Sequence, residues 1–167
     1  IGALGSLLDR LNYDYDGNHP KGRKLVFVGD IVDRGPDSVA TYQWVRHILE
    51  KGNGKCVLGN HELNLLIPDP KNVDPNDPTP KKKTGNHWFH GLPEAMIKGC
   101  SDFQFQRFAN DELRTEIQNF CHSLPLVLEN EHIGIVHSCW HQPSIDLLRY
   151  ENKSTMEVYN QYNDQFI

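Results

Sequence analysis

Residues 24–35 read KLVFVGDIVDRG, an apolar run that ends at a glycine and continues into charged side chains. Such a run predicts a buried strand at about 24–29. Two later strands repeat this plan, since one precedes Gly59-Asn60-His61-Glu62 and the other, Ile133–Val136, precedes His137. Carboxylate, amide and imidazole groups at strand ends indicate a site for cations and an anionic substrate, because these groups are metal ligands.

The elements around the first strand follow from apolar spacing and capping residues. Leucines at helical spacing predict a first helix over about 3–11. A second helix is expected over 38–50, with Asp37 or Ser38 as its N-cap, and a strand over 55–58 follows. Strand, helix and strand in this order imply a parallel pair with a right-handed crossover.

The second half of the chain continues the alternation of helices and strands. A helical pattern runs from Asp102 to Cys121. Apolar segments at 124–129 and 132–137 flank a polar turn and predict an antiparallel hairpin. A polar helix is expected from Ser154. Alternating elements of this kind place the chain in the α/β class.

Length, net charge and cysteine spacing limit the classes of protein to which this chain can belong. The 167 residues suit one domain, 1–167, which can bury a core. No apolar run approaches the roughly 20 residues that span a bilayer. The net charge of −5 argues against a protein that wraps nucleic acid by charge alone. The four cysteines lack the spacing of a zinc ribbon or redox pair and predict buried thiols in a reducing, cytoplasmic setting; they are Cys56, Cys100, Cys121 and Cys139.

Residues 68–84 differ in composition from the rest of the chain. Prolines alternate there with aspartates before Lys81-Lys82-Lys83, a pattern that excludes a central strand or helix. The segment is therefore expected to be a long surface insertion. Two interpretations stay open: an ordinary loop, or a flap that brings the lysines and the following Trp88-Phe89-His90 toward a substrate.

The residues at the three strand ends are candidate metal ligands. Asp30 can bridge two divalent cations, Asn60 offers an amide oxygen and His137 an imidazole nitrogen. Each residue alone has an ordinary explanation, as a turn residue or a core histidine. All three stand at the carboxyl ends of strands, where ligands gather in open α/β sheets, so together they favour a metal site.

Three neighbouring residues are candidates for catalysis. Arg34 carries a planar guanidinium that suits two phosphate oxygens. His61 can protonate a leaving oxygen as a general acid. Asp33 can accept the other ring proton of His61 and so fix its tautomer. Glu62 is expected in the first turn of the next helix, where negative charge is favourable.

These motifs together resemble the calcineurin-like metallophosphoesterases, in the branch of the phosphoprotein phosphatases and the symmetrical bis(5'-nucleosyl)-tetraphosphatases. The resemblance implies that Asp30 bridges two metals and that Asn60 and His137 bind the second. It also implies that Asp33 and His61 form an acid pair and that Arg34 binds phosphate. The match extends over nearly the whole chain.

The resemblance carries a fold and a reaction as well. The fold implied is a four-layer α-β-β-α sandwich with two mixed β-sheets. The cofactors implied are two divalent metal ions, Mn²⁺ first, with Fe, Zn, Mg or Co as alternatives. The reaction implied is in-line attack on phosphorus by water or hydroxide between the metals, without a covalent phosphoenzyme.

Two parts of the family pattern are missing. Family members begin with a strand that ends in Asp-x-His, whereas this chain begins at Ile1 inside a predicted helix. A later Gly-His strand end is also absent before Ile167. The sequence is therefore expected to be a fragment that lacks the first strand and the C-terminal strands.

The subfamily pattern favours a nucleotide polyphosphate or terminal phosphate as substrate. Leu58 stands where phosphoprotein phosphatases have an arginine, and Ser138-Cys139-Trp140 replaces their glycines. Together with Ser123–Leu126, this turn looks like the bacterial tetraphosphatase-like group. Trp88, Phe89 or Trp140 could stack on a base, although aromatic residues more often belong to the core.

The same residues are compatible with alternative functions. One is a serine/threonine phosphoprotein phosphatase, and another is a non-catalytic phosphate-binding module of the same fold. Retention of both Asp33 and His61 argues against a pure binder. Nucleic-acid binding would rest on Lys81–Lys83 alone, a weak signal.

Overall fold

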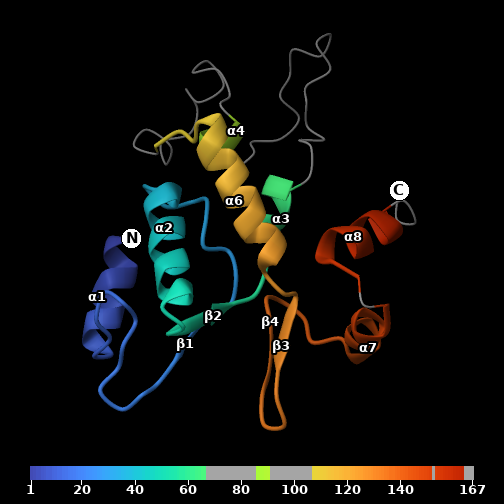
Figure 1. The fold of residues 1–167 in the computed structure, drawn as a ribbon, viewed down its shortest axis with the longest axis horizontal. Coiled ribbons are helices and arrows are strands. Elements are labelled where there is room, and N and C mark those ends of the chain that lie inside the picture. The colour runs from blue at the N-terminus through green and yellow to red at the C-terminus, as the bar shows by residue number, and fades with distance from the viewer. Residues whose placement is uncertain (67–85, 91–106, 152, 164–167) are drawn as a thin grey trace.

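A computed structural model describes residues 1–66, 86–90, 107–151 and 153–163 (Figure 1). Helices and strands alternate from α1 to α3, and the later described elements follow as helices, a pair of strands and two further helices. The helices are α1 (Gly2–Arg10), α2 (Ser38–Glu50), α3 (Asn60–Leu66), α4 (His87–His90), α6 (Asp111–Ser123), α7 (Gln142–Glu151) and α8 (Thr155–Asn163). The strands are β1 (Leu25–Phe27), β2 (Gly54–Cys56), β3 (Val127–Glu129) and β4 (Gly134–Val136).

The first sheet pairs β1 with β2 in parallel, as the strand–helix–strand order predicts. Leu25 lies opposite Gly54 and Phe27 opposite Cys56. The intervening helix α2 has its predicted bounds, and its N-cap is Asp37, whose carboxylate accepts from the Ala40 amide at 2.9 Å. Capping stabilises the first turn because it satisfies an amide that has no partner within the helix.

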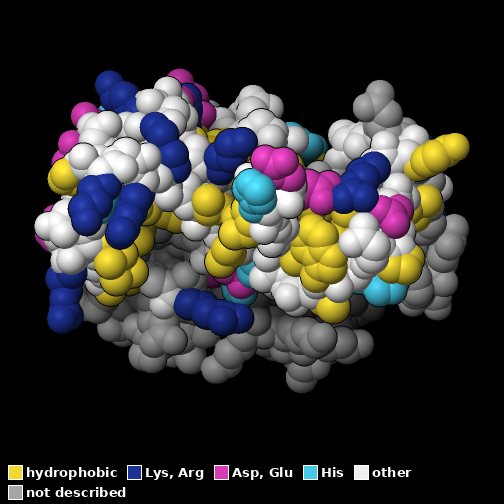
Figure 2. Space-filling view, turned by 90° about the horizontal axis from the view of Figure 1, so that it is seen from below, with side chains coloured by type: hydrophobic (Ala, Val, Ile, Leu, Met, Phe, Trp, Pro, Cys, Tyr) yellow, Lys and Arg dark blue, Asp and Glu magenta, His cyan; other side chains and the backbone are white. Residues whose placement is uncertain are grey.

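The prediction of a buried strand at about 24–29 is wrong in burial and in length, because β1 spans Leu25–Phe27 and none of its three residues is fully buried. Leu25 and Phe27 pack against the α2 side, whereas Val26 and Val28 are exposed. Successive side chains of a strand point to opposite faces, so only the face toward α2 is covered by described residues. Figure 2 shows separate apolar groups interspersed with charged side chains on the face seen from below.

The second sheet is the predicted antiparallel hairpin. Val127 lies opposite Val136 and Glu129 opposite Gly134. The Asn130 side chain closes the turn by accepting from the amides of His132 and Ile133. The Leu58 amide donates to the Pro125 carbonyl at 2.8 Å, so the segment after β2 is bonded to the segment before β3.

Helix α6 lies beside α3 (Figure 1), and its buried residues Ile117 and Cys121 belong to the main core cluster. It begins at Asp111 and not at Asp102, because Asn110 has extended backbone angles and caps the helix by accepting from Leu113 N. Residues 107–110 are outside the helix, and 102–106 lie outside the described residues. The main core cluster includes Val39, Leu65, Trp88, Phe89, Ile117 and Cys121.

The remaining predictions have mixed outcomes. The C-terminal helix is present as α8, whereas α4 and α7 were not predicted. The 68–84 insertion lies outside the described residues. In the described part, one small sheet is parallel and the other antiparallel, which gives an α/β arrangement. None of the described helices is both long and apolar enough to cross a bilayer.

The cysteine prediction is confirmed at two positions and wrong at one. Cys56 and Cys121 are buried, but Cys139 is exposed in the segment between β4 and α7. Cys100 lies outside the described residues. Burial raises the pKa of the Cys56 thiol to about 12 and also raises the pKa of Cys121. Both thiols therefore stay protonated at neutral pH.

We expect Cys139 to react with a maleimide at pH 7.5 well before Cys56 and Cys121, because the thiolate is the reactive form and only Cys139 is exposed among these three. Peptide mapping by mass spectrometry reports each site separately, and labelling in urea gives the fully reactive reference. Labelling of native Cys56 at the rate of Cys139 would contradict the buried core.

Candidate functional site

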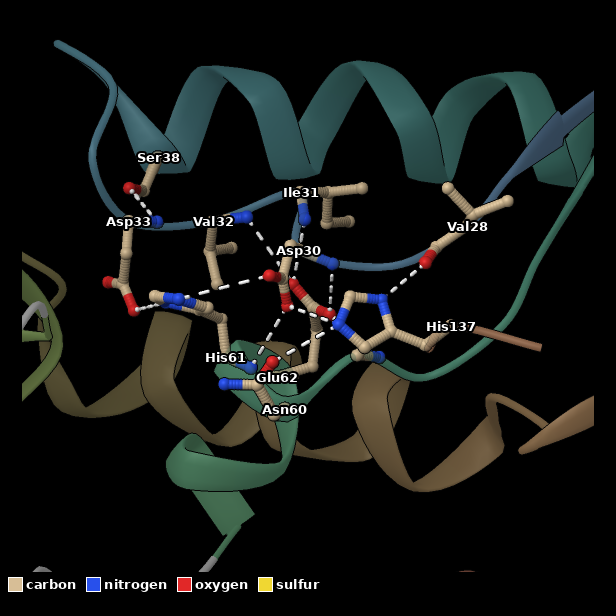
Figure 3. Close-up of polar contacts among 11 residues, drawn as sticks. Val28, Asp30, Ile31, Val32, Asp33, Ser38, Asn60, His61, Glu62 and His137 are labelled. Carbon is tan, nitrogen blue, oxygen red and sulfur yellow. Dashed lines mark hydrogen bonds and ion pairs between the residues drawn. The ribbon is translucent and has the colours of Figure 1, made fainter. Parts of the chain in front are cut away.

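Three segments that are distant in sequence meet at the carboxyl ends of the strands (Figure 3). They are the loop after β1, the start of α3 after β2 and the residue after β4. Parallel pairing explains the first two, since both strands deliver their carboxyl ends to one edge. Asp30, Asn60 and His137 are thereby brought together from these segments, as the sequence predicts.

The surroundings of the His137 ring determine which of its two nitrogens carries the hydrogen. Its Nδ1 lies 2.6 Å from the Val28 carbonyl oxygen. A carbonyl can only accept, so Nδ1 carries the hydrogen and the neutral ring presents a lone pair at Nε2. That Nε2 atom lies 3.1 Å from Asn60 Oδ1 and 3.4 Å from Asp30 Oδ1.

Three acceptor atoms therefore face one another at this point. A carboxylate oxygen, an amide oxygen and an imidazole nitrogen repel each other unless a cation or proton lies between them. These are also donor types that divalent metals take in proteins. The described residues form no closed cluster of three His, Cys, Asp or Glu ligands. The residues Asp30, Asn60 and His137 could thus hold a metal ion that has further coordination positions open.

The loop that carries Asp30 has a strained backbone. Asp30, Asp33 and Arg34 have φ angles of 54°, 64° and 55°, in the left-handed region that side chains other than glycine rarely adopt. Each such residue costs on the order of 1–3 kcal/mol, so the surrounding structure must hold the loop in place.

Glu62 supplies that restraint. Its carboxylate is fully buried, at 0% exposure, and accepts from the amides of Asp30 at 2.8 Å and Ile31 at 2.9 Å. It also accepts from Val32 at 3.3 Å and from Gly59 at 3.0 Å. One side chain thereby joins the Asp30 loop to the turn that begins α3. Burial raises the pKa of Glu62, while the donated amide bonds act in the opposite direction.

The sequence placed Glu62 correctly in the first turn of α3 but missed this role. An acidic residue in a helix's first turn is ordinarily explained by the helix dipole. Nothing in the sequence indicates that its carboxylate reaches a loop about 30 positions earlier.

The two loops approach so closely that glycine is required where they meet. A Cβ atom added at Gly59 would lie 2.5 Å from the Asp30 amide nitrogen and carboxylate. One added at Gly29, where φ is 82°, would lie 2.6 Å from the Gly59 nitrogen. Any side chain at either position would push Asp30 away from Asn60.

The predicted pair of Asp33 and His61 is also brought together. His61 Nδ1 lies 2.7 Å from Asp33 Oδ2, and His61 Nε2 lies 3.8 Å from Asp30 Oδ2. The Asp33 amide donates to Ser38 Oγ, at the start of α2. Trp88 Nε1 donates to the other Asp33 oxygen at 2.6 Å, a contact that the sequence did not predict. The arrangement directs His61 Nε2 toward the side where Asp30 lies.

Arg34 follows Asp33 on the same strained loop, and its side chain is exposed. An exposed guanidinium can bind an anion that enters from solvent.

The idea that Trp88 or Phe89 stacks on a substrate is wrong. Both rings are 1% exposed and contact each other edge to face inside the core. Trp140 is exposed, but its ring lies over Gly134 of β4, where an added Cβ would overlap it. Trp88 and Phe89 thus stabilise the core beside α6, and Trp140 covers the hairpin.

A cavity of about 330 Å³ opens beside Asn60 and His137. Its walls come from α3, the hairpin and α7, and they are mainly aliphatic. The apolar lining includes Leu58, Leu63, Leu126, Val136, Ile145 and Leu148. The cavity therefore offers an apolar surface next to the candidate metal ligands.

Comparison with known proteins gives matches to proteins named bis(5'-nucleosyl)-tetraphosphatase. A segment of 61 residues is 44% identical to the asymmetrical bis(5'-nucleosyl)-tetraphosphatase PrpE of Halalkalibacterium halodurans, covering 35% of this chain and 25% of that protein. A 47-residue segment is 49% identical to the symmetrical bis(5'-nucleosyl)-tetraphosphatase of Ralstonia nicotianae, covering 28% and 17%. The matched segments thus span a quarter or less of these relatives' own lengths.

A model of the calcineurin-like phosphoesterase family matches residues 2–164. The match includes every strand and helix that contributes to the site described above. Members of this family use divalent metal ions, in agreement with the acceptor atoms that converge on one point. The chain therefore belongs to the calcineurin-like phosphoesterase family.

Proposed function

We propose that this chain carries part of the active site of a metal-dependent phosphoesterase that hydrolyses a phosphate ester or phosphoanhydride of a nucleotide-type substrate. The observation that carries the proposal is the convergence of Asp30, Asn60 and His137 on one point, with the Asp33–His61 pair beside them. Family membership supports the same reaction class.

Asp30, Asn60 and His137 are the proposed metal ligands, with Asp30 as the bridge between two ions. Mn²⁺ is the proposed metal, because oxygen donors with one imidazole suit it, and Fe, Zn, Mg and Co are the alternatives. When bound, such ions activate water and offset the charge of the phosphate. Glu62 keeps the loop of Asp30 and the turn of Asn60 at a fixed separation.

His61 is the proposed general acid. Asp33 holds the Nδ1 hydrogen, so a second proton at Nε2 can pass to the leaving oxygen as its bond to phosphorus breaks. Arg34 is the proposed phosphate ligand, since its exposed guanidinium stands one residue from Asp33. The chain's own residues thus supply orientation, charge and the proton.

The fold proposal goes beyond the two small sheets of the described residues. We infer that β1–β2 and β3–β4 belong to the two mixed sheets of a four-layer α-β-β-α sandwich. Family membership supports this, because the calcineurin-like phosphoesterase model matches residues 2–164 and so includes all four strands.

A nucleotide is the proposed substrate on two grounds. The relatives matched here carry the name bis(5'-nucleosyl)-tetraphosphatase. The cavity beside Asn60 and His137 offers an apolar wall against which a base can pack while its phosphates reach the metal ligands. This cavity takes the place of the aromatic stacking that the buried Trp88 and Phe89 exclude.

We expect His61→Ala to lower turnover by roughly 10²–10⁴, the usual contribution of a positioned acid, while bound metal is retained. The loss should shrink for 4-nitrophenyl phosphate, whose leaving group needs no proton. Steady-state kinetics of the full-length protein, with metal content by elemental analysis, measure both effects. The exposed His132→Ala serves as a matched control. Equal losses for good and poor leaving groups would argue against an acid role.

For the substrate, a side-by-side assay of the Mn²⁺-loaded full-length protein should give the highest kcat/KM with a dinucleoside tetraphosphate, ahead of a mononucleotide and a phosphopeptide. Leu148→Trp narrows the cavity and should raise KM for the dinucleotide without changing KM for 4-nitrophenyl phosphate. Leu147→Trp, on the exposed side of α7, is the control. A preference for the phosphopeptide would assign the chain to the phosphoprotein phosphatases instead.

A further inference from the structure

The proposed acid pair has a third member whose contact is unexplained by packing alone. Trp88 lies in the short helix α4, 55 positions after Asp33, and is 1% exposed. Its indole Nε1 donates to Asp33 Oδ1 at 2.6 Å. Short hydrogen bonds to a charged acceptor are stronger than neutral ones. The ring therefore does more than fill space beside Phe89.

The two oxygens of the Asp33 carboxylate have different hydrogen-bond partners. Oδ2 lies 2.7 Å from His61 Nδ1, whereas Oδ1 accepts from Trp88. Its side chain is 1% exposed, so water reaches neither oxygen freely. A buried carboxylate needs partners on both oxygens, and here the indole provides the partner that His61 does not.

The second donor also fixes the rotation of the carboxylate. The terminal torsion of an aspartate side chain is broad and is not set by staggering. The Asp33 backbone lies in the left-handed region, at φ 64°, and its amide bond to Ser38 Oγ restrains the main chain only. The carboxylate plane, and with it the direction of the His61 ring, therefore depends on the two donors together.

We propose that Trp88 is a positioning residue for proton donation: its indole N–H holds Asp33 so that Asp33 in turn aims His61 at the leaving oxygen. This inference rests on the proposed function, because it assigns a role within the same site. Without the indole hydrogen bond, the carboxylate can rotate and the His61 ring loses its fixed direction. Turnover is therefore lowered for substrates whose leaving group needs a proton.

The test compares Trp88→Phe with Trp44→Phe in the full-length Mn²⁺-loaded protein. Both substitutions keep a large aromatic ring and remove an indole N–H. Trp44 is 7% exposed, and its N–H donates to the Tyr15 carbonyl at 2.8 Å, away from the candidate site. The quantity measured is the ratio of kcat for a poor leaving group, an alkyl phosphate, to kcat for 4-nitrophenyl phosphate. This ratio is independent of the fraction of folded enzyme.

We expect Trp88→Phe to lower that ratio about 10-fold, the order of effect of one hydrogen bond to a charged group, with metal content unchanged. Trp44→Phe should leave the ratio unchanged. In a His61→Ala background, Trp88→Phe should have no further effect on the ratio, since the two residues act in series. Equal losses for both substrates in Trp88→Phe would overturn the inference and leave Trp88 as a core residue.

A measurement that needs no Trp88 variant covers the case in which Trp88→Phe does not fold. The Trp88 indole N–H resonance of the wild-type protein should move upfield in Asp33→Ala, while those of Trp44 and Trp140 stay in place. An unmoved Trp88 resonance would overturn the inference. If His61→Ala itself leaves the leaving-group ratio unchanged, the proposed acid role fails, which is a separate outcome from failure of the Trp88 contact.

Discussion

The Glu62 carboxylate is the interaction on which the rest of the site depends. It accepts backbone amides from the Asp30 loop and from the Gly59 turn, so a single buried side chain connects the ends of two strands. The loop that it holds contains three left-handed residues other than glycine, which would not persist without such a restraint. The positions of Asp30 and Asn60 both follow from this connection.

Two layers of contacts position the side chains of the site, one for the candidate metal ligands and one for His61. In one, Glu62 and the closely packed Gly29 and Gly59 bring the candidate metal ligands to one point. In the other, Trp88 and His61 occupy opposite oxygens of Asp33. Both layers use buried carboxylates whose oxygens all have donors, and this satisfies groups that would otherwise destabilise the core.

Much of the fold and site could be predicted from sequence, because strand ends, helix caps and turns are local signals. The parallel β1–β2 pair, the bounds of α2 and the convergence of Asp30, Asn60 and His137 belong to this class. The contacts of Glu62 and Trp88 could not be predicted, since each reaches a residue about 30 or 55 positions away and leaves no periodic pattern. The late start of α6 was missed because the Asn110 cap is a weak local signal compared with a long helical pattern.

The most direct test of whether Glu62 positions the metal ligands is the Mn²⁺ affinity of the full-length Glu62→Gln variant. Isothermal titration calorimetry measures it. Glutamine keeps the shape but turns one acceptor into a donor that faces backbone amides, so we predict affinity about 10–100-fold weaker, as for other residues that support metal ligands. Asp30→Asn gives the reference for complete loss of Mn²⁺ binding, and Glu112→Gln, at an exposed position, is the control that should keep the wild-type affinity. Unchanged Mn²⁺ affinity in a folded Glu62→Gln protein would contradict the account.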